Sequence, residues 1–217
     1  MTFTLQYNGV LVSNQQRGHR VENKRAIRFA IDPFLRTLWA KNPELHRIGA
    51  HEGKLTRLRS ASWVGNTLRI DPLTGGMDGP LIWSPFPYVS VDGLTYIMLV
   101  NQLNRWRCNV NIKLLVPDRE ETQGDLDNRL KTLYDGLRPP HNLGEVGSGG
   151  KVPQDGLVFC LVEDDSMLRN RSVEVESLLE SLPASNQMED RTNYVSAIIG
   201  VTLADSNGGP IRVAGAP

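Results

Sequence analysis

The sequence predicts an α+β domain, a mixed β-sheet with helices packed mainly on one face. Short apolar runs with the period of strands recur along the chain, and longer segments show the apolar spacing of helices. One helical segment separates two strand candidates, and such a crossover favours some parallel pairing. At 217 residues the chain is long enough to bury a core, as one large domain or as a domain with an extension. A single domain with an enlarged amino-terminal region is expected.

The amino-terminal part is predicted to be one strand followed by one helix. Phe3–Tyr7 has strand character, and a polar, basic loop follows over residues 13–20. A helix is expected from about Asn23 to Trp39, and Pro33 is expected to kink or split it. The arginines that fall largely off its apolar stripe, within reach of a partner, are Arg25, Arg28 and Arg36.

Two hairpins are predicted in the middle of the chain. Residues 63–70 form a hairpin around a Gly-Asn pair, and residues 88–99 form another around Asp92-Gly93, a favourable turn sequence. Between them, residues 71–88 are rich in proline and glycine and are interpreted as an ordered loop.

The last hundred residues alternate strand and helix signals. Strands are predicted at Val110–Val116, Leu157–Val162 and Tyr194–Leu203. A helix is predicted after the first of them, where four leucines recur at helical spacing, and another at Val173–Leu182. Residues 138–156 combine a Pro-Pro pair with a glycine-rich run, so a mobile insertion is expected there, and residues 206–217 are expected to be a frayed tail.

The most informative segment is Gly124-Asp125-Leu126-Asp127-Asn128-Arg129-Leu130-Lys131, which lies where the first of these strands gives way to a helix. Asp125 and Asp127 are carried at an element boundary, and Lys131 follows Asp127 by one helical turn. Two carboxylates, an amide and an amine suit a divalent metal acting on phosphate. Helix capping by Asp125, and pairing of Lys131 with Asp127 or Asp135, are the simpler structural explanations.

A second acidic cluster, Glu163-Asp164-Asp165, directly follows the apolar strand Leu157–Val162. Two or three carboxylates from two elements are enough for a hard cation such as magnesium. An exposed turn at the end of a strand explains this cluster equally well.

Together these residues resemble the motifs of the RusA family of Holliday junction resolvases, magnesium-dependent endonucleases of phage and bacterial origin. The resemblance covers roughly residues 100–205, and the chain departs from the family in its long separation of the two motifs and in about 70 amino-terminal residues with no counterpart. The matching positions are Asp125, Asp127, Asn128, Lys131, Asp164 and Asp165.

The resemblance implies a RusA-like fold, a homodimer, and hydrolysis of branched DNA. It also implies that Asp125, Asp127 and one of the pair Asp164 and Asp165 are the essential carboxylates, with Asp165 the preferred third. All four are candidate ligands of magnesium, with manganese as the alternative ion, and Lys131 is implied to assist catalysis.

Formal net charge is zero, but its distribution is uneven. Residues 1–70 hold twelve Lys and Arg against four Asp and Glu, and the remainder holds twelve against twenty. The basic amino-terminal region, taken as about 1–90, is interpreted as a phosphate-binding surface, with an ordinary solvated face as the alternative. Local charge density selects these candidate phosphate contacts: Arg17, Arg20, Lys24, Arg25 and Arg28.

Several classes of protein are disfavoured. Cys108 and Cys160 have no metal-like spacing and are expected to be reduced and buried, and the four histidines form no zinc pattern. No window approaches the roughly 18 apolar residues that span a bilayer, and the first residues lack a signal-peptide pattern. A cytoplasmic protein without a membrane partner is therefore expected.

The first hypothesis is a magnesium-dependent endonuclease that cuts branched DNA. The rival is a nucleic-acid-binding or regulatory module that keeps the fold but has lost catalysis. A phosphohydrolase acting on a small nucleotide is the third possibility, although the sequence offers no phosphate-cradling glycine motif for it.

Overall fold

The computed structural model describes residues 1–13, 17–42, 45, 61–64, 67–70, 88–102, 106–117, 125–148, 152–178, 193–205, 207, 209 and 211. Within the helices and strands, the side chains of residues 17, 18, 40, 61–64 and 67–70 are outside the description. The predicted loop at 71–88 and the predicted tail at 206–217 lie almost wholly outside the described residues.

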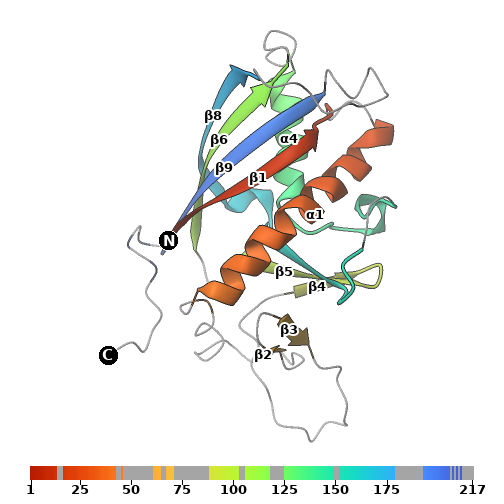
Figure 1. Cartoon of the computed structure of the whole chain (residues 1–217), viewed down its shortest axis with the longest axis vertical. Coiled ribbons are helices and arrows are strands. Elements are labelled where there is room, and N and C mark those ends of the chain that lie inside the picture. The colour runs from red at the N-terminus through yellow and green to blue at the C-terminus, as the bar shows by residue number, and fades with distance from the viewer. Residues whose placement is uncertain are drawn as a thin grey trace, which may run out of the picture.

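The described part is an α+β fold with two α-helices and three sheets, which confirms the predicted class (Figure 1). The four-stranded sheet has the order β1-β9-β6-β8, the three-stranded sheet has the order β4-β5-β7, and β2 pairs with β3. The strands are β1 Thr2–Val10, β2 Ala61–Val64, β3 Thr67–Ile70, β4 Tyr88–Val91, β5 Leu94–Val100, β6 Arg107–Val116, β7 Leu157–Val162, β8 Leu168–Ser177 and β9 Tyr194–Ala204. The helices are α1 Arg17–Lys41 and α4 Leu126–Gly136, with short 3-10 helices η1 Leu143–Glu145 and η2 Asp165–Met167.

The four-stranded sheet follows directly from strand periodicity. Every second residue of β6 from Cys108 to Val116 is buried, and β9 alternates in the same way. β9 runs antiparallel to both β1 and β6, whereas β8 runs parallel to β6. The buried residues of these strands form one hydrophobic core with α1 and α4, so both helices cover the same face of the sheet.

In the three-stranded sheet, β5 and β7 are deeply buried, whereas β4 has no buried residue. All six residues of β7 are buried, and β7 runs parallel to β5. α1 protects the backbone of β7 with side chains: the Phe159 amide donates to Asp32 at 2.7 Å, and Arg36 donates to the Leu157 carbonyl at 2.9 Å. Burial raises the pKa of Asp32. The contacts from α1 provide hydrogen-bond partners for backbone groups of β7 that would otherwise pair with a neighbouring strand.

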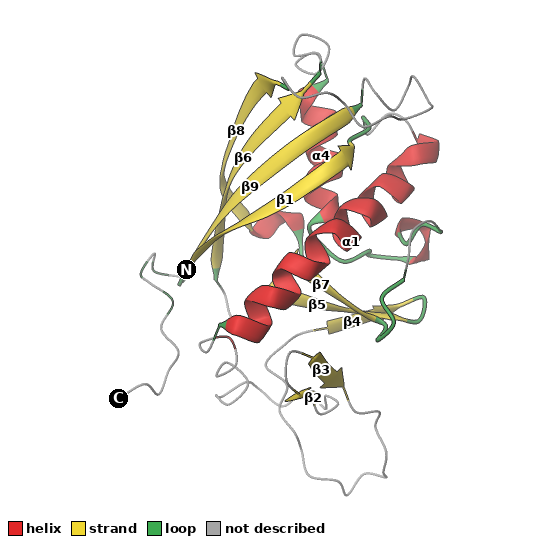
Figure 2. Cartoon of the chain, in the orientation of Figure 1, coloured by secondary structure: helices red, strands yellow, loops and turns green. Residues whose placement is uncertain are grey.

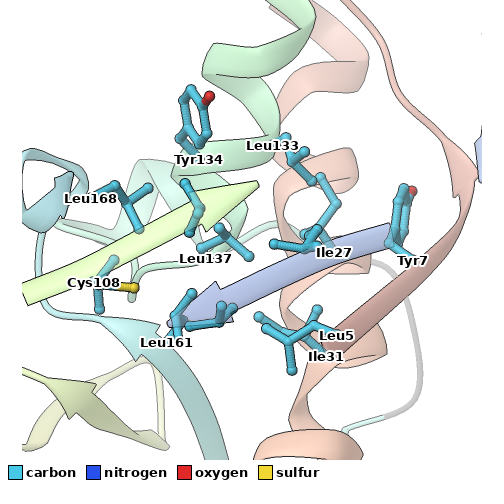
Figure 3. Packing of buried hydrophobic residues seen from close by; sticks show 14 of the residues in the cluster. Leu5, Tyr7, Ile27, Ile31, Cys108, Leu133, Tyr134, Leu137, Leu161 and Leu168 are labelled. Atoms are coloured by element: carbon cyan, nitrogen blue, oxygen red, sulfur yellow. The ribbon is translucent and has the colours of Figure 1, made fainter. Parts of the chain in front are cut away.

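The core brings α4 against α1 and the inner faces of the strands, as Figure 3 shows for Leu133, Leu137 and Ile27. The approach of the two helices is close at Gly136, where an added Cβ would lie 2.6 Å from Cγ2 of Ile27. A side chain at this position would therefore push the helices apart.

The structure differs from the sequence expectation in three segments. The predicted helix at Val173–Leu182 is the strand β8 as far as Ser177, because its valines alternate with glutamates and pair with β6. Pro33 does not split α1, which continues through it. Part of the expected mobile insertion is packed: Arg138 is 4% and Val146 3% exposed, whereas residues 141–144 are exposed.

The remaining predicted elements are confirmed in kind. The strands β1, β6, β7 and β9, the helix α4 and both hairpins lie where the sequence predicts them, although β1 and α1 are longer. Asp92 and Gly93 both have positive φ, as their hairpin turn requires. The helical crossover does precede a parallel strand, but β6 and β7 belong to different sheets.

Candidate functional site: the two acidic pairs at the ends of α4

Asp125 occupies the residue before α4 without capping the helix through its side chain. Its backbone carbonyl accepts from the Arg129 amide at 3.2 Å, which is the first turn of the helix. Its carboxylate accepts from Nδ2 of Asn128 at 2.7 Å instead of from a backbone amide. The simple capping explanation therefore does not account for this carboxylate, and Asn128 fixes its orientation.

Asp127 and Lys131 are exposed on one face of α4, one turn apart. Among the described residues, neither side chain has a hydrogen bond or an ion pair in the structure. Asp135, the alternative partner of Lys131, is occupied by Lys24 and Arg138. Asp127 and Lys131 are therefore available to a ligand from outside the chain.

The second acidic pair follows β7. The Asp164 carboxylate accepts from the Ser166 amide at 2.9 Å, and Nε2 of His141 lies 3.5 Å from it. The Ser166 hydrogen bonds, followed by the charges of His141 and Arg138, hold the pKa of Asp164 below its usual value. Within the described residues, the carboxylate of the neighbouring Asp165 has no partner, and only its backbone carbonyl accepts hydrogen bonds.

The two acidic pairs are associated with opposite ends of α4, the helix drawn in red beside the four-stranded sheet in Figure 2. Asp125 precedes the helix, whereas the carbonyl of Leu137, after its last turn, accepts from the amides of Leu161 and Val162 just before the second pair. Eleven helical residues span about 16 Å. No group of three or more His, Cys, Asp or Glu side chains is gathered in a metal-holding arrangement among the described residues.

The donor set nevertheless suits magnesium in type and number at the amino-terminal end of α4. Magnesium prefers oxygen ligands, and in phosphate chemistry it is commonly held by one or two carboxylates, several waters and the substrate phosphate. Asp125 and Asp127 supply two such carboxylates. Asp164 and Asp165 do not join them in a single centre in this structure.

The structure adds two residues that the sequence interpretation missed, Arg171 and Tyr134. The guanidinium of Arg171, on β8, lies 4.8 Å from the ring centroid of Tyr134, on α4. Burial raises the pKa of Tyr134. The charge of Arg171 has a smaller lowering effect on this pKa, and the charge of Asp127 has a smaller raising effect. No local sequence pattern marks Arg171: Leu168 and Val173 both face inward but are five residues apart, and this break in alternation is visible only once the structure shows that both are inward.

The candidate phosphate contacts of α1 are mostly internal. Lys24, Arg25 and Arg28 are 2%, 6% and 1% exposed. Arg28 donates to the backbone carbonyls of Arg138, Glu145 and Asp135, and Arg25 donates to those of Val146 and Gly147. These side chains attach residues 138–148 to α1, so they do not offer a phosphate-binding surface in this structure.

Arg20 is the most accessible of the described candidates. Its side chain is 28% exposed and contacts Asp135 at 3.3 Å. The side chain of Arg17 lies outside the described residues. The expectation that Arg25 and Arg28 lie within reach of a partner was wrong, because residues 138–148 cover that part of α1.

Comparison of the chain with protein-family models, with curated proteins and with solved structures gave no match. Among the described helices, none is both long and apolar enough to cross a membrane.

Proposed function

We propose that the chain is a magnesium-dependent endonuclease that hydrolyses the phosphodiester backbone of branched DNA as a homodimer, in the manner of the RusA-like resolvases that its motifs resemble. The observation that carries the proposal is the amino-terminal end of α4. There, Asp127 and Lys131 are exposed and without partners among the described residues, beside an Asp125 carboxylate oriented by Asn128. Oriented carboxylates next to a free amine suit phosphoryl chemistry.

Each residue has a distinct role in this proposal. Asp125 and Asp127 hold the magnesium or manganese ion, and the hydrogen bond from Asn128 prevents the Asp125 carboxylate from rotating away. The bound ion supplies Lewis acidity and an activated water. Lys131 lies within one turn of Asp127 and offsets the charge that develops on the phosphoryl oxygens. Asp165, with Asp164, supplies further negative charge at the other end of the helix.

A catalytically inactive nucleic-acid-binding module is the second candidate, and one observation favours it. The two acidic pairs are associated with opposite ends of α4, a helix of eleven residues about 16 Å long, rather than gathered in one centre among the described residues. Such a module binds DNA with strong salt dependence but does not cut it.

The test is cleavage of a labelled synthetic four-way junction by the wild-type chain, beside linear duplex, single strand and a free nucleotide, with magnesium or manganese and with chelator. Metal-dependent paired cuts in the junction support the proposal. Junction binding without cutting in either metal supports the inactive module. Hydrolysis of the free nucleotide, unaffected by competing junction, would overturn both.

A further inference from the structure

Arg171 is directed toward α4 by an irregularity in β8. Asn109 of β6 pairs with Arg169, and Asn111 pairs with Ser172, so Val110 alone faces both Asn170 and Arg171. Asn170 has a φ of 43°, in the left-handed region that asparagine tolerates better than most residues. Such a bulge inserts one residue and changes the face to which the next side chain points.

The bulge turns Arg171 to the helix-bearing side of the sheet and fixes it there. Its Nε donates to the Leu168 carbonyl at 3.1 Å, and its Nη2 donates to the Asp165 carbonyl at 2.9 Å. Its guanidinium lies 4.8 Å from the centre of the Tyr134 ring. Figure 3 shows this ring at the margin of the core cluster, with its hydroxyl pointing away from it.

The positive charge of Arg171 has no carboxylate partner among the described residues. Both of its hydrogen-bond acceptors are neutral carbonyls, and it is absent from the ion pairs of the described residues. Nη1 carries two further N–H groups with no acceptor in the structure among the described residues. An exposed guanidinium that is held on three sides and keeps free donors is suited to an oxyanion.

We propose that Arg171 holds a backbone phosphate of the nucleic acid, with Tyr134 as the platform that fixes its guanidinium. This rests on the proposed function and deepens it by identifying where the strand crosses the chain. Along α4, Asp127, Lys131 and Tyr134 lie at spacings of four and three residues, hence on one face. The bound strand then runs along this face from Lys131 to Arg171, toward Asp165.

The test is equilibrium binding of a fluorescent four-way junction in chelator, measured over a range of salt, so that cutting does not intervene. Arg171→Gln keeps the length of the side chain and some hydrogen bonding but removes the charge. We expect about tenfold weaker binding and a salt slope smaller by about 0.9, the loss of one phosphate contact. Lys113→Gln is the matched control, because Lys113 is exposed on the same sheet and pairs with Glu176.

Arg171→Lys is the second variant, because it keeps the positive charge that Arg171→Gln removes. We expect it to keep the wild-type salt slope, provided that circular dichroism shows a native fold. An Arg171→Gln slope equal to that of the control would overturn the inference even if the wild type cuts junctions. A reduced slope in a chain that never cuts would support the inference and overturn the nuclease. A wild type that does not bind DNA would overturn both.

Discussion

Replacement of Asp135 by asparagine tests the buried ionic cluster that fixes residues 138–148. Asp135 is 4% exposed, and its carboxylate is paired with Lys24 and, at 3.0 and 3.3 Å, with Arg138 and Arg20. Burial alone would raise the pKa of Asp135, but the hydrogen bond and charge of Lys24, with the two arginines, hold it below its usual value. Asparagine keeps the shape but leaves buried cations without their counter-charge.

Removing one partner from a buried ion pair costs about 3 to 5 kcal/mol. Part of the cluster is accessible, since the Arg20 side chain is 28% exposed, so we expect the lower end, about 3 kcal/mol. Urea unfolding of Asp135→Asn, followed by circular dichroism, measures this loss. Glu176→Gln is the control, because it breaks an exposed pair with Lys113 and should leave the unfolding midpoint unchanged. A loss below about 1 kcal/mol would refute the view that this cluster is a principal attachment of the segment.

Two further predictions concern the same region. Glu145 is partly buried, but its hydrogen bonds from Arg138 and the His141 amide, with the charge of Arg138, lower its pKa from 4.5 to about 2. Because the pKa of Glu145 is depressed in the folded state, its ionised carboxylate stabilises the fold fully above pH 4.5, and this stabilisation is lost as the pH falls toward 2. Glu145→Gln should therefore flatten the dependence of the urea midpoint on acid pH. An acid dependence equal to that of the wild type would contradict this. Gly136→Ala places a methyl group 2.6 Å from Ile27. It should destabilise the folded chain by about 1 to 3 kcal/mol, despite the higher helix propensity of alanine. A higher thermal unfolding midpoint than that of the wild type would show that α1 and α4 separate easily.

Periodicity was sufficient to predict most elements around the candidate site. The alternation in β6 and β9 and the leucine spacing of α4 have a single interpretation, because each element buries one face. Val173–Leu182, which includes the last part of the strand β8, was wrongly predicted to be a helix. The bulge at Asn170 breaks the alternation of β8, and only two inward valines follow, so the local pattern was too short to exclude a helix.

Charge density was a poor guide to the location of functional cations. Lys24, Arg25 and Arg28 stand in a basic segment, but the partners that bury them come from residues 135–147, more than a hundred positions away. Residues 138–156 were predicted to be mobile because they combine a Pro-Pro pair with a glycine-rich run. Ionic and carbonyl contacts, which no local pattern reveals, attach residues 138, 145, 146 and 147 of that segment to α1. By the same reasoning, the free cation at Arg171 became visible only when the fold placed it beside Tyr134.

Single-turnover cleavage of a four-way junction by Asp127→Asn in magnesium tests the central claim most directly. Asp92→Asn is the matched control, because Asp92 is an exposed carboxylate at a hairpin turn whose positive φ asparagine tolerates. If the amino-terminal end of α4 is the catalytic centre, Asp127→Asn retains the fold and DNA binding but loses at least about a thousandfold in cleavage rate, about 4 kcal/mol in the barrier, and Asp92→Asn cuts like the wild type. Equal cleavage by the two variants would contradict the claim.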